Sequence, residues 1–101
     1  MNTESINMKL VPREKAALSV YDLDPGDYYF YTDDENQQWM ICALPGGHIA
    51  HLPIRPLRSP ATNGGHSWDW DRNEQKPTLL PSVNSIGNWH GWIREGRMVS
   101  C

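Results

Sequence analysis

The side chains best suited to chemistry in this sequence include His90 and Cys101. They belong to the segment Trp89–Cys101, in which two apolar runs flank Glu95-Gly96. A two-residue loop with glycine at its second position favours a tight β-hairpin. In that register His90 faces Cys101, and the Cβ atoms of directly opposed residues lie roughly 4.5–5.5 Å apart on one face of a sheet. An imidazole and a thiolate at this separation could share one metal ion.

Cys42 and the histidines that follow it supply the other candidate metal ligands. Cys42 precedes the turn Leu44-Pro45-Gly46-Gly47, and His48 and His51 come after that turn. Neutral imidazole and thiolate are ligands that zinc prefers, and four protein ligands make a closed, structural site. The predicted zinc site consists of Cys42, one of His48 and His51, His90 and Cys101.

The length of the loop after Leu44 decides which histidine shares a sheet face with Cys42. A two-residue loop pairs Cys42 with Ile49 and places it on the face of His51. A three-residue loop pairs it with Ala50 and places it on the face of His48, because a shift of one residue exchanges the two faces of a strand. The sequence leaves both registers open.

Antiparallel hairpins must position these groups. Alternation of apolar and polar residues, or enrichment in aromatic and β-branched residues, marks each of the segments expected to be extended. The segments are 28–32, 38–43, 48–54, 66–70 and the proline-containing 77–83, besides the terminal hairpin. The predicted fold class is mainly β, a small single domain of antiparallel β-hairpins spanning residues 9–101, with a short helix over Pro12–Leu18 and a flexible tail over residues 1–8.

Composition narrows the functional classes. The chain has 101 residues, 9 Lys and Arg, 12 Asp and Glu, and a net charge of −3, which gives no overall attraction to a phosphate backbone. Two cysteines are too few for a small secreted disulfide scaffold, and no run of 18 apolar residues could form a membrane span. We therefore expect a cytoplasmic protein without a direct nucleic-acid contact. A disulfide between Cys42 and Cys101 is the least favoured arrangement in that setting.

Aromatic and acidic residues indicate a surface for a protein partner. Five tryptophans are many for a domain of this size, and aromatic side chains dominate interaction hot spots. We expect some of Trp39, Trp68, Trp70, Trp89 and Trp92 to be exposed. The predicted partner-binding residues are Trp68, Asp69, Trp70, Asp71, Glu74 and Trp92.

Residues 38–101 carry a resemblance to a known family. The strongest parts are Lys76–Val83, which reads KPTLLPSV, and Trp89–Arg97, which reads WHGWIREGR; Cys42 and the glycine-rich turn add to them. These segments resemble small phage- and prophage-encoded proteins of unknown function, some of which carry a misleading ammonia monooxygenase label. The resemblance implies zinc ligation by Cys42, by His48 or His51, and by His90.

Two functions follow as expectations. The first is a non-enzymatic phage or mobile-element accessory protein that binds a host protein and inhibits a host defence system, in the manner of an anti-CRISPR protein. The alternative is a small zinc-dependent hydrolase, in which three of the candidate ligands leave one metal position open. The sequence favours the non-enzymatic function, and it singles out no catalytic residue.

Overall fold

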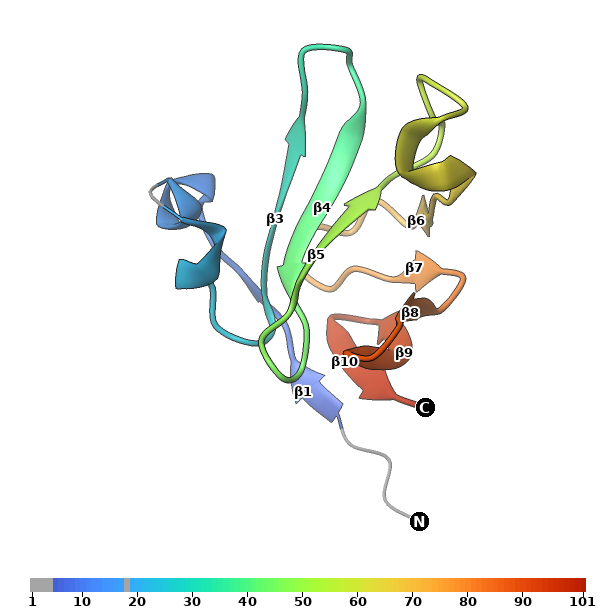
Figure 1. Cartoon of the computed structure of the whole chain (residues 1–101). Helices are drawn as coiled ribbons and strands as arrows, with labels where there is room; N and C mark the ends of the chain where they lie inside the picture. Colours follow the sequence, from blue (N-terminus) through green and yellow to red (C-terminus); the bar gives the residue numbers. More distant parts are fainter. Residues whose placement is uncertain (1–4, 18) are drawn as a thin grey trace.

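The computed structural model describes residues 5–17 and 19–101, which fold as a mainly β domain (Figure 1). Ten strands and three short 3-10 helices follow one another along these described residues. The strands are β1 (Ser5–Asn7), β2 (Lys9–Leu10), β3 (Asp27–Thr32), β4 (Gln38–Ala43), β5 (Ile49–Pro53), β6 (Asp69–Trp70), β7 (Leu79–Leu80), β8 (Val83–Ser85), β9 (Trp89–Arg94) and β10 (Arg97–Ser100). The 3-10 helices are η1 (Arg13–Ala16), η2 (Val20–Asp22) and η3 (Thr62–Gly65).

Two four-stranded sheets make up most of the domain. One has the order β1-β10-β9-β8, the other the order β2-β3-β4-β5, and β6 and β7 form a separate pair. All but one of these strand pairs are antiparallel, the exception being β2 with β3. The predicted fold class of antiparallel hairpins is therefore confirmed. The chain passes from the first sheet to the second between β1 and β2, at Met8.

The terminal hairpin has the predicted register. Its loop residues, Glu95 and Gly96, have φ angles of 49° and 76°, the positive values that a primed two-residue turn requires. The Cys101 N–H donates to the His90 carbonyl at 3.0 Å, which continues the pairing to the last residue. The pairs are Arg94 with Arg97, Ile93 with Met98, Trp92 with Val99, and Gly91 with Ser100.

The hairpin of β4 and β5 adopts the longer of the two candidate loops. Cys42 pairs with Ala50, and the Leu44 N–H donates to the His48 carbonyl at 2.8 Å. Gly46 and Gly47 both have positive φ, at 95° and 97°, which side chains disfavour. This register decides which side chains of β5 face the core.

The main core lies between the two large sheets. Period-2 alternation points one set of side chains from each sheet inward, and they form one buried cluster with the strand β7. Its members are Tyr28, Met40, Cys42, Leu44, Ala50, Leu52, Ile54, Leu79, Val83, Ile93 and Met98. A second cluster covers the opposite face of β3, β4 and β5, where Val11 and Leu23 pack from the N-terminal segment.

Four predictions about segments need correction. Residues 1–8 are predicted as a tail; residues 1–4 lie outside the described residues, and Ser5–Asn7 pair as β1, because β10 supplies the ladder that a short polar segment cannot make alone. The predicted helix after Pro12 is the 3-10 turn η1, and Leu18 lies outside the described residues. The segment 66–70 is regular only at β6, with one bridge from Trp68 to Ile54. The segment 77–83 divides into β7 and the start of β8.

Within the described part of the chain, no helix is long and apolar enough to cross a membrane.

Candidate active site

The hairpin of β8 and β9 brings a serine and a histidine together. Its loop is Ile86-Gly87-Asn88, closed by a bond from the Asn88 N–H to the Ser85 carbonyl at 2.8 Å. Asn84 is the cross-strand partner of His90. Ser82 comes two residues before Asn84, so period-2 alternation places its side chain on the same face, diagonal to His90.

Ser82 Oγ and His90 Nε2 lie 3.4 Å apart. The serine is half-buried, whereas the histidine is exposed at the rim of the sheet. A separation of 3.4 Å is long for a hydrogen bond, and catalytic hydrogen bonds often tighten only when a substrate binds. The pair therefore has the geometry of a hydroxyl nucleophile with an imidazole base beside it.

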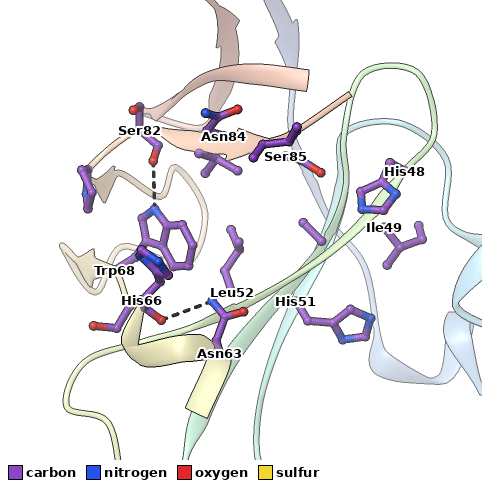
Figure 2. Close-up of a pocket in the computed structure, with 15 residues that line it drawn as sticks. His48, Ile49, His51, Leu52, Asn63, His66, Trp68, Ser82, Asn84 and Ser85 are labelled. Carbon is purple, nitrogen blue, oxygen red and sulfur yellow. Dashed lines mark hydrogen bonds between the residues drawn. The ribbon is translucent and has the colours of Figure 1, made fainter. Parts of the chain in front are cut away.

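Trp68 fixes the backbone at Ser82. Its indole N–H donates to the Ser82 carbonyl at 3.3 Å, as the dashed line in Figure 2 shows, and its own backbone N–H donates to the Pro53 carbonyl at 3.0 Å. The side chain packs against the main core. One residue thus joins the end of β5 to the serine on the other sheet, and it limits how far Ser82 can move.

Trp89 and Gly91 support the histidine from the opposite face of β9. The Trp89 indole N–H donates to Ser100 Oγ at 2.8 Å, which lays the ring across Gly91. A Cβ at position 91 would lie 2.2 Å from Trp89 Cζ2 and 2.4 Å from the Val99 carbonyl oxygen. The glycine is required there, because any side chain would displace the tryptophan next to His90 in the chain.

A cavity of about 680 Å³ opens beside Ser82. The exposed edges of β5 and β8 form two of its walls, and Trp68 closes one end (Figure 2). His48 and His51 lie away from Trp68, toward the other end. The cavity is large enough for several residues of a peptide and reaches the strand that carries the serine.

The candidate zinc ligands do not converge. Cys42 is fully buried in the main core, where burial raises the pKa of its thiol to about 12. His48, His51, His90 and Cys101 are exposed. The pKa of His51 is lowered, mainly because neighbouring atoms remove part of the water around its ring, and secondly because His48 carries a like charge. Across residues 5–17 and 19–101, no three His, Cys, Asp or Glu side chains are grouped closely enough to hold a metal ion. The described structure therefore does not bring the predicted zinc ligands together, since the core encloses Cys42 and separates it from the others. Both cysteines are free thiols, so the disulfide alternative is also excluded.

The predicted partner-binding residues have mainly structural contacts. Trp70 stacks on Phe30 with ring centroids 4.1 Å apart, and Asp69 forms an ion pair with Arg55 at 2.9 Å. Asp71 Oδ1 accepts the backbone N–H groups of Asn73 and Thr78, at 3.1 and 3.2 Å. Glu74 and Trp92 complete the set. The Glu74 carbonyl accepts a hydrogen bond from the Tyr28 hydroxyl, and Arg94 lies 5.3 Å above the ring of Trp92.

All five tryptophans are half-buried, so none is fully enclosed and none is freely exposed.

Most of the chain matches one known protein family. The family model of the bacterial ubiquitination-like system serine protease, BubE, matches residues 14–101. The chain belongs to the BubE family. No curated protein and no solved structure matches it.

BubE membership corrects two predictions and supports a third in part. The resemblance to phage-encoded zinc-binding proteins is wrong, since the matched family is a bacterial protease family. A phage accessory protein that inhibits host defence is likewise the wrong function, because the family description points to an enzyme-associated role. The expectation of a protein partner in general agrees with a ubiquitination-like system, which acts on proteins.

Sequence reasoning did not single out Ser82. The serine lies within the segment that carried the resemblance, eight residues before His90. The signal that could have found it is the hairpin itself: a loop centred on Gly87 places Asn84 opposite His90, and the residue two positions earlier becomes a diagonal neighbour. The interpretation of His90 as a metal ligand paired it instead with Cys101, which lies opposite it across the terminal hairpin.

Proposed function

We propose that this chain is a serine peptidase with Ser82 as the nucleophile and His90 as the general base. The observation that carries the proposal is the separation of 3.4 Å between Ser82 Oγ and His90 Nε2. The description of the BubE family as serine proteases supports it independently. A serine hydroxyl is a weak nucleophile at neutral pH unless an adjacent base accepts its proton, so the pairing is the feature that gives Ser82 reactivity.

In the proposed reaction, Ser82 Oγ attacks the carbonyl carbon of a peptide bond while its proton passes to His90 Nε2. The tetrahedral intermediate collapses, the C–N bond breaks, and the imidazolium returns the proton to the leaving amine. Water, deprotonated by His90, then attacks the Ser82 ester; the bond between the carbonyl carbon and Ser82 Oγ breaks, the imidazolium returns its proton to Oγ, and the acid is released. The atoms balance with water as the only co-reactant.

The substrate we propose is a protein. The family description names a ubiquitination-like system, and such systems attach or process proteins, so the partner expected at this site is the polypeptide that is cut. We also propose a reducing, cytoplasmic setting, which the two free cysteines support. The partner proposed for this chain is therefore a protein substrate, and not the host protein expected from the sequence.

Labelling with a fluorophosphonate tests the proposal without knowledge of the substrate. This small reagent forms a covalent bond with the serine of a serine hydrolase, and intact-protein mass spectrometry counts the adducts. The purified full chain should take up one adduct, located at Ser82 by peptide mapping. Ser82→Ala should take up none.

Ser59→Ala is the matched control. Ser59 is also half-buried, and it lies in the loop before η3, where its Oγ accepts the Ala61 N–H at 3.4 Å. This variant should label as the unaltered chain does. Absence of labelling in the unaltered chain, or labelling that persists in Ser82→Ala, would show that Ser82 is not the nucleophile.

A further inference from the structure

Two strand edges face the same cavity. β8 is the last strand of one sheet and β5 the last strand of the other, and the cavity beside Ser82 is lined by residues of both. An edge strand presents N–H and C=O groups that a further strand can pair with. In Figure 2 both edges lie along the space that begins at Trp68. The cavity thus has backbone hydrogen-bonding groups on two walls.

The edge of β8 is free beyond Ser82. The closing bond from the Asn88 N–H to the Ser85 carbonyl makes Ser85 and Trp89 a hydrogen-bonded pair, and such pairs alternate along an antiparallel ladder. The N–H and C=O of Asn84 therefore point away from β9. The Ser82 carbonyl follows the same alternation, because its partner is the Trp68 indole and not β9.

The free backbone groups on the edge of β5 are identified in the same way. The Ile54 N–H donates to the Gln38 carbonyl at 2.8 Å, which makes Ala50 and Leu52 the residues bonded to β4. The backbone groups of Ile49 and His51 consequently point to the free edge. At Pro53, the next position of that kind, the carbonyl accepts the N–H of Trp68. Trp68 therefore covers both edges at one end of the cavity and leaves them free farther along.

We propose that this cavity holds an extended segment of the protein substrate, which pairs as an added antiparallel or parallel strand with the free edge of β8 while β5 forms the opposite wall. The inference rests on the proposed function and adds to it the conformation of the substrate. Outward N–H and C=O groups at every second residue match a polypeptide backbone, whose groups have the same period. The apolar side chains of Leu52, Val83 and Trp68 at the cavity suit its side chains.

The position of Ser82 at one end of the cavity sets the direction in which the bound substrate extends. The serine directly precedes β8, so a strand paired with Asn84 runs within about 5 Å of it, the ordinary spacing of paired strands. Trp68 closes the cavity on the side of Ser82, and the free edges continue toward Ile86. The paired part of the substrate therefore extends from the serine toward the β8–β9 loop. A segment folded into a helix could not pair in this way.

Amide hydrogen exchange by NMR tests this binding without catalysis. The probe is reduced, carboxymethylated casein, an unfolded polypeptide with many sequences, and the protein is the ¹⁵N-labelled Ser82→Ala variant of the full chain. Exchange of the Asn84 amide should slow several-fold when casein is added, together with those of Ile49 and His51. A natively folded protein with no free segment, added at the same mass concentration, should leave these amides unchanged. Slowing that leaves Asn84 unaffected would overturn the proposal.

A proline at position 84 tests the same edge in the active protein. Asn84→Pro removes the outward N–H without removing a ladder bond to β9, and edge strands tolerate proline. Asn84→Ala removes the same side chain and retains the N–H. Asn84→Pro should cut labelled casein much more slowly than Asn84→Ala when the cleavage rate of each variant is divided by its own rate of fluorophosphonate labelling.

The two assays separate the two proposals. Normal cleavage of casein by Asn84→Pro would overturn strand pairing at β8 and leave the serine peptidase proposal intact. Loss of fluorophosphonate labelling in the unaltered chain would instead contradict the peptidase proposal. If Asn84→Pro does not fold, as judged by its circular dichroism, the exchange experiment decides the question, because it uses the natural residue at position 84.

Discussion

Ser82, which directly precedes β8, and His90, on β9, are diagonal neighbours with Oγ and Nε2 3.4 Å apart, and the short β8–β9 turn links their backbones. Their relative position is therefore set by the ladder register of β8 and β9. A slip of one residue would turn one of the two side chains to the opposite face and separate them. The chemistry depends on a register that the rest of the sheet holds in place.

Replacement of His90 tests its role as the base. His90→Ala should lower the rate of fluorophosphonate labelling by about a thousandfold, within the range of roughly 10²–10⁴ that a general base contributes. Thermal unfolding should change little, because the side chain is exposed. The matched control is Cys101→Ser, which alters the cross-strand neighbour of His90 on β10. Similar loss of labelling in Cys101→Ser would indicate that the thiol takes part.

Trp68 should act as a positioning residue. Trp68→Phe retains an aromatic ring in the core and removes the N–H that holds the Ser82 carbonyl. A hydrogen bond contributes about 1 kcal/mol, which corresponds to about fivefold in rate if it acts only on alignment. The maximal rate of labelling should fall by this factor while the reagent concentration giving half the maximal rate stays the same. A change in that concentration alone would contradict the positioning role.

Gly91→Ala should destabilise the fold. The added methyl would lie 2.2 Å from the Trp89 ring and 2.4 Å from the Val99 carbonyl oxygen, and overpacking of this kind costs about 1–3 kcal/mol. Urea unfolding measures the change. Ser100→Ala, which removes only the bond donated by Trp89, should cost about 1 kcal/mol. Equal stability of Gly91→Ala and the unaltered chain would show that the tryptophan can move freely.

The two thiols should differ sharply in reactivity. Burial in the main core raises the pKa of Cys42 to about 12, whereas Cys101 is exposed. The thiolate is the reactive form, so a disulfide reagent at neutral pH should titrate one thiol in the native protein and two after denaturation. Cys101→Ser should leave no thiol that reacts in the native state. Rapid reaction of both in native protein would contradict the burial of Cys42.

Stability should fall in acid because of Asp27. Burial alone would raise the pKa of this carboxyl, but the hydrogen bonds from Lys15 and from the Asp24 N–H outweigh it and leave the pKa below 3.8. A lowered folded-state pKa contributes stability above the unfolded value, and this contribution is lost as the pH falls through the folded value. Asp27→Asn should cost about 2 kcal/mol near neutral pH and flatten the decline below about pH 4. Urea unfolding at several pH values measures both, and a decline of the same size in Asp27→Asn would assign it to other carboxyls.

The local part of this fold follows from sequence, as the terminal hairpin illustrates. Glu95 and Gly96 specify a two-residue turn, and that turn fixes every pair of β9 and β10 without help from distant residues. The prediction of the segment 38–43 as a strand agrees with β4 at both ends for the same reason, since composition and flanking turns are local. Two loop lengths stayed open after Leu44, although the ring of Pro45 holds φ at about −65° and cannot supply the positive φ that a primed two-residue turn needs at its first position.

The candidate site was predicted only in part, although its serine and histidine meet across one short hairpin. His90 was identified from its residue type and assigned to metal ligation with Cys101, because Cys101 lies across the terminal hairpin from it. Ser82 became a partner through the β8–β9 ladder, whose second strand is shared with that hairpin. The tie from Trp68 to Ser82 bridges two sheets, and no period or motif in the sequence predicts such a contact.

The pairing of β1 with β10 also bears on how the chain can fold during synthesis. Arg97 donates a hydrogen bond to Ser5 over a separation of 92 residues, so β1 leaves the ribosome long before its partner strand exists. Until β10 emerges, β9 lacks one neighbour and β1 lacks its only one, whereas β3, β4 and β5 can already pair with each other. The nascent chain therefore exposes an incomplete sheet with unpaired edges, the kind of surface that associates with other chains. Ser82 and His90 lie at the short β8–β9 hairpin, which can form locally, but β10, the strand that flanks His90 on its other side, emerges later.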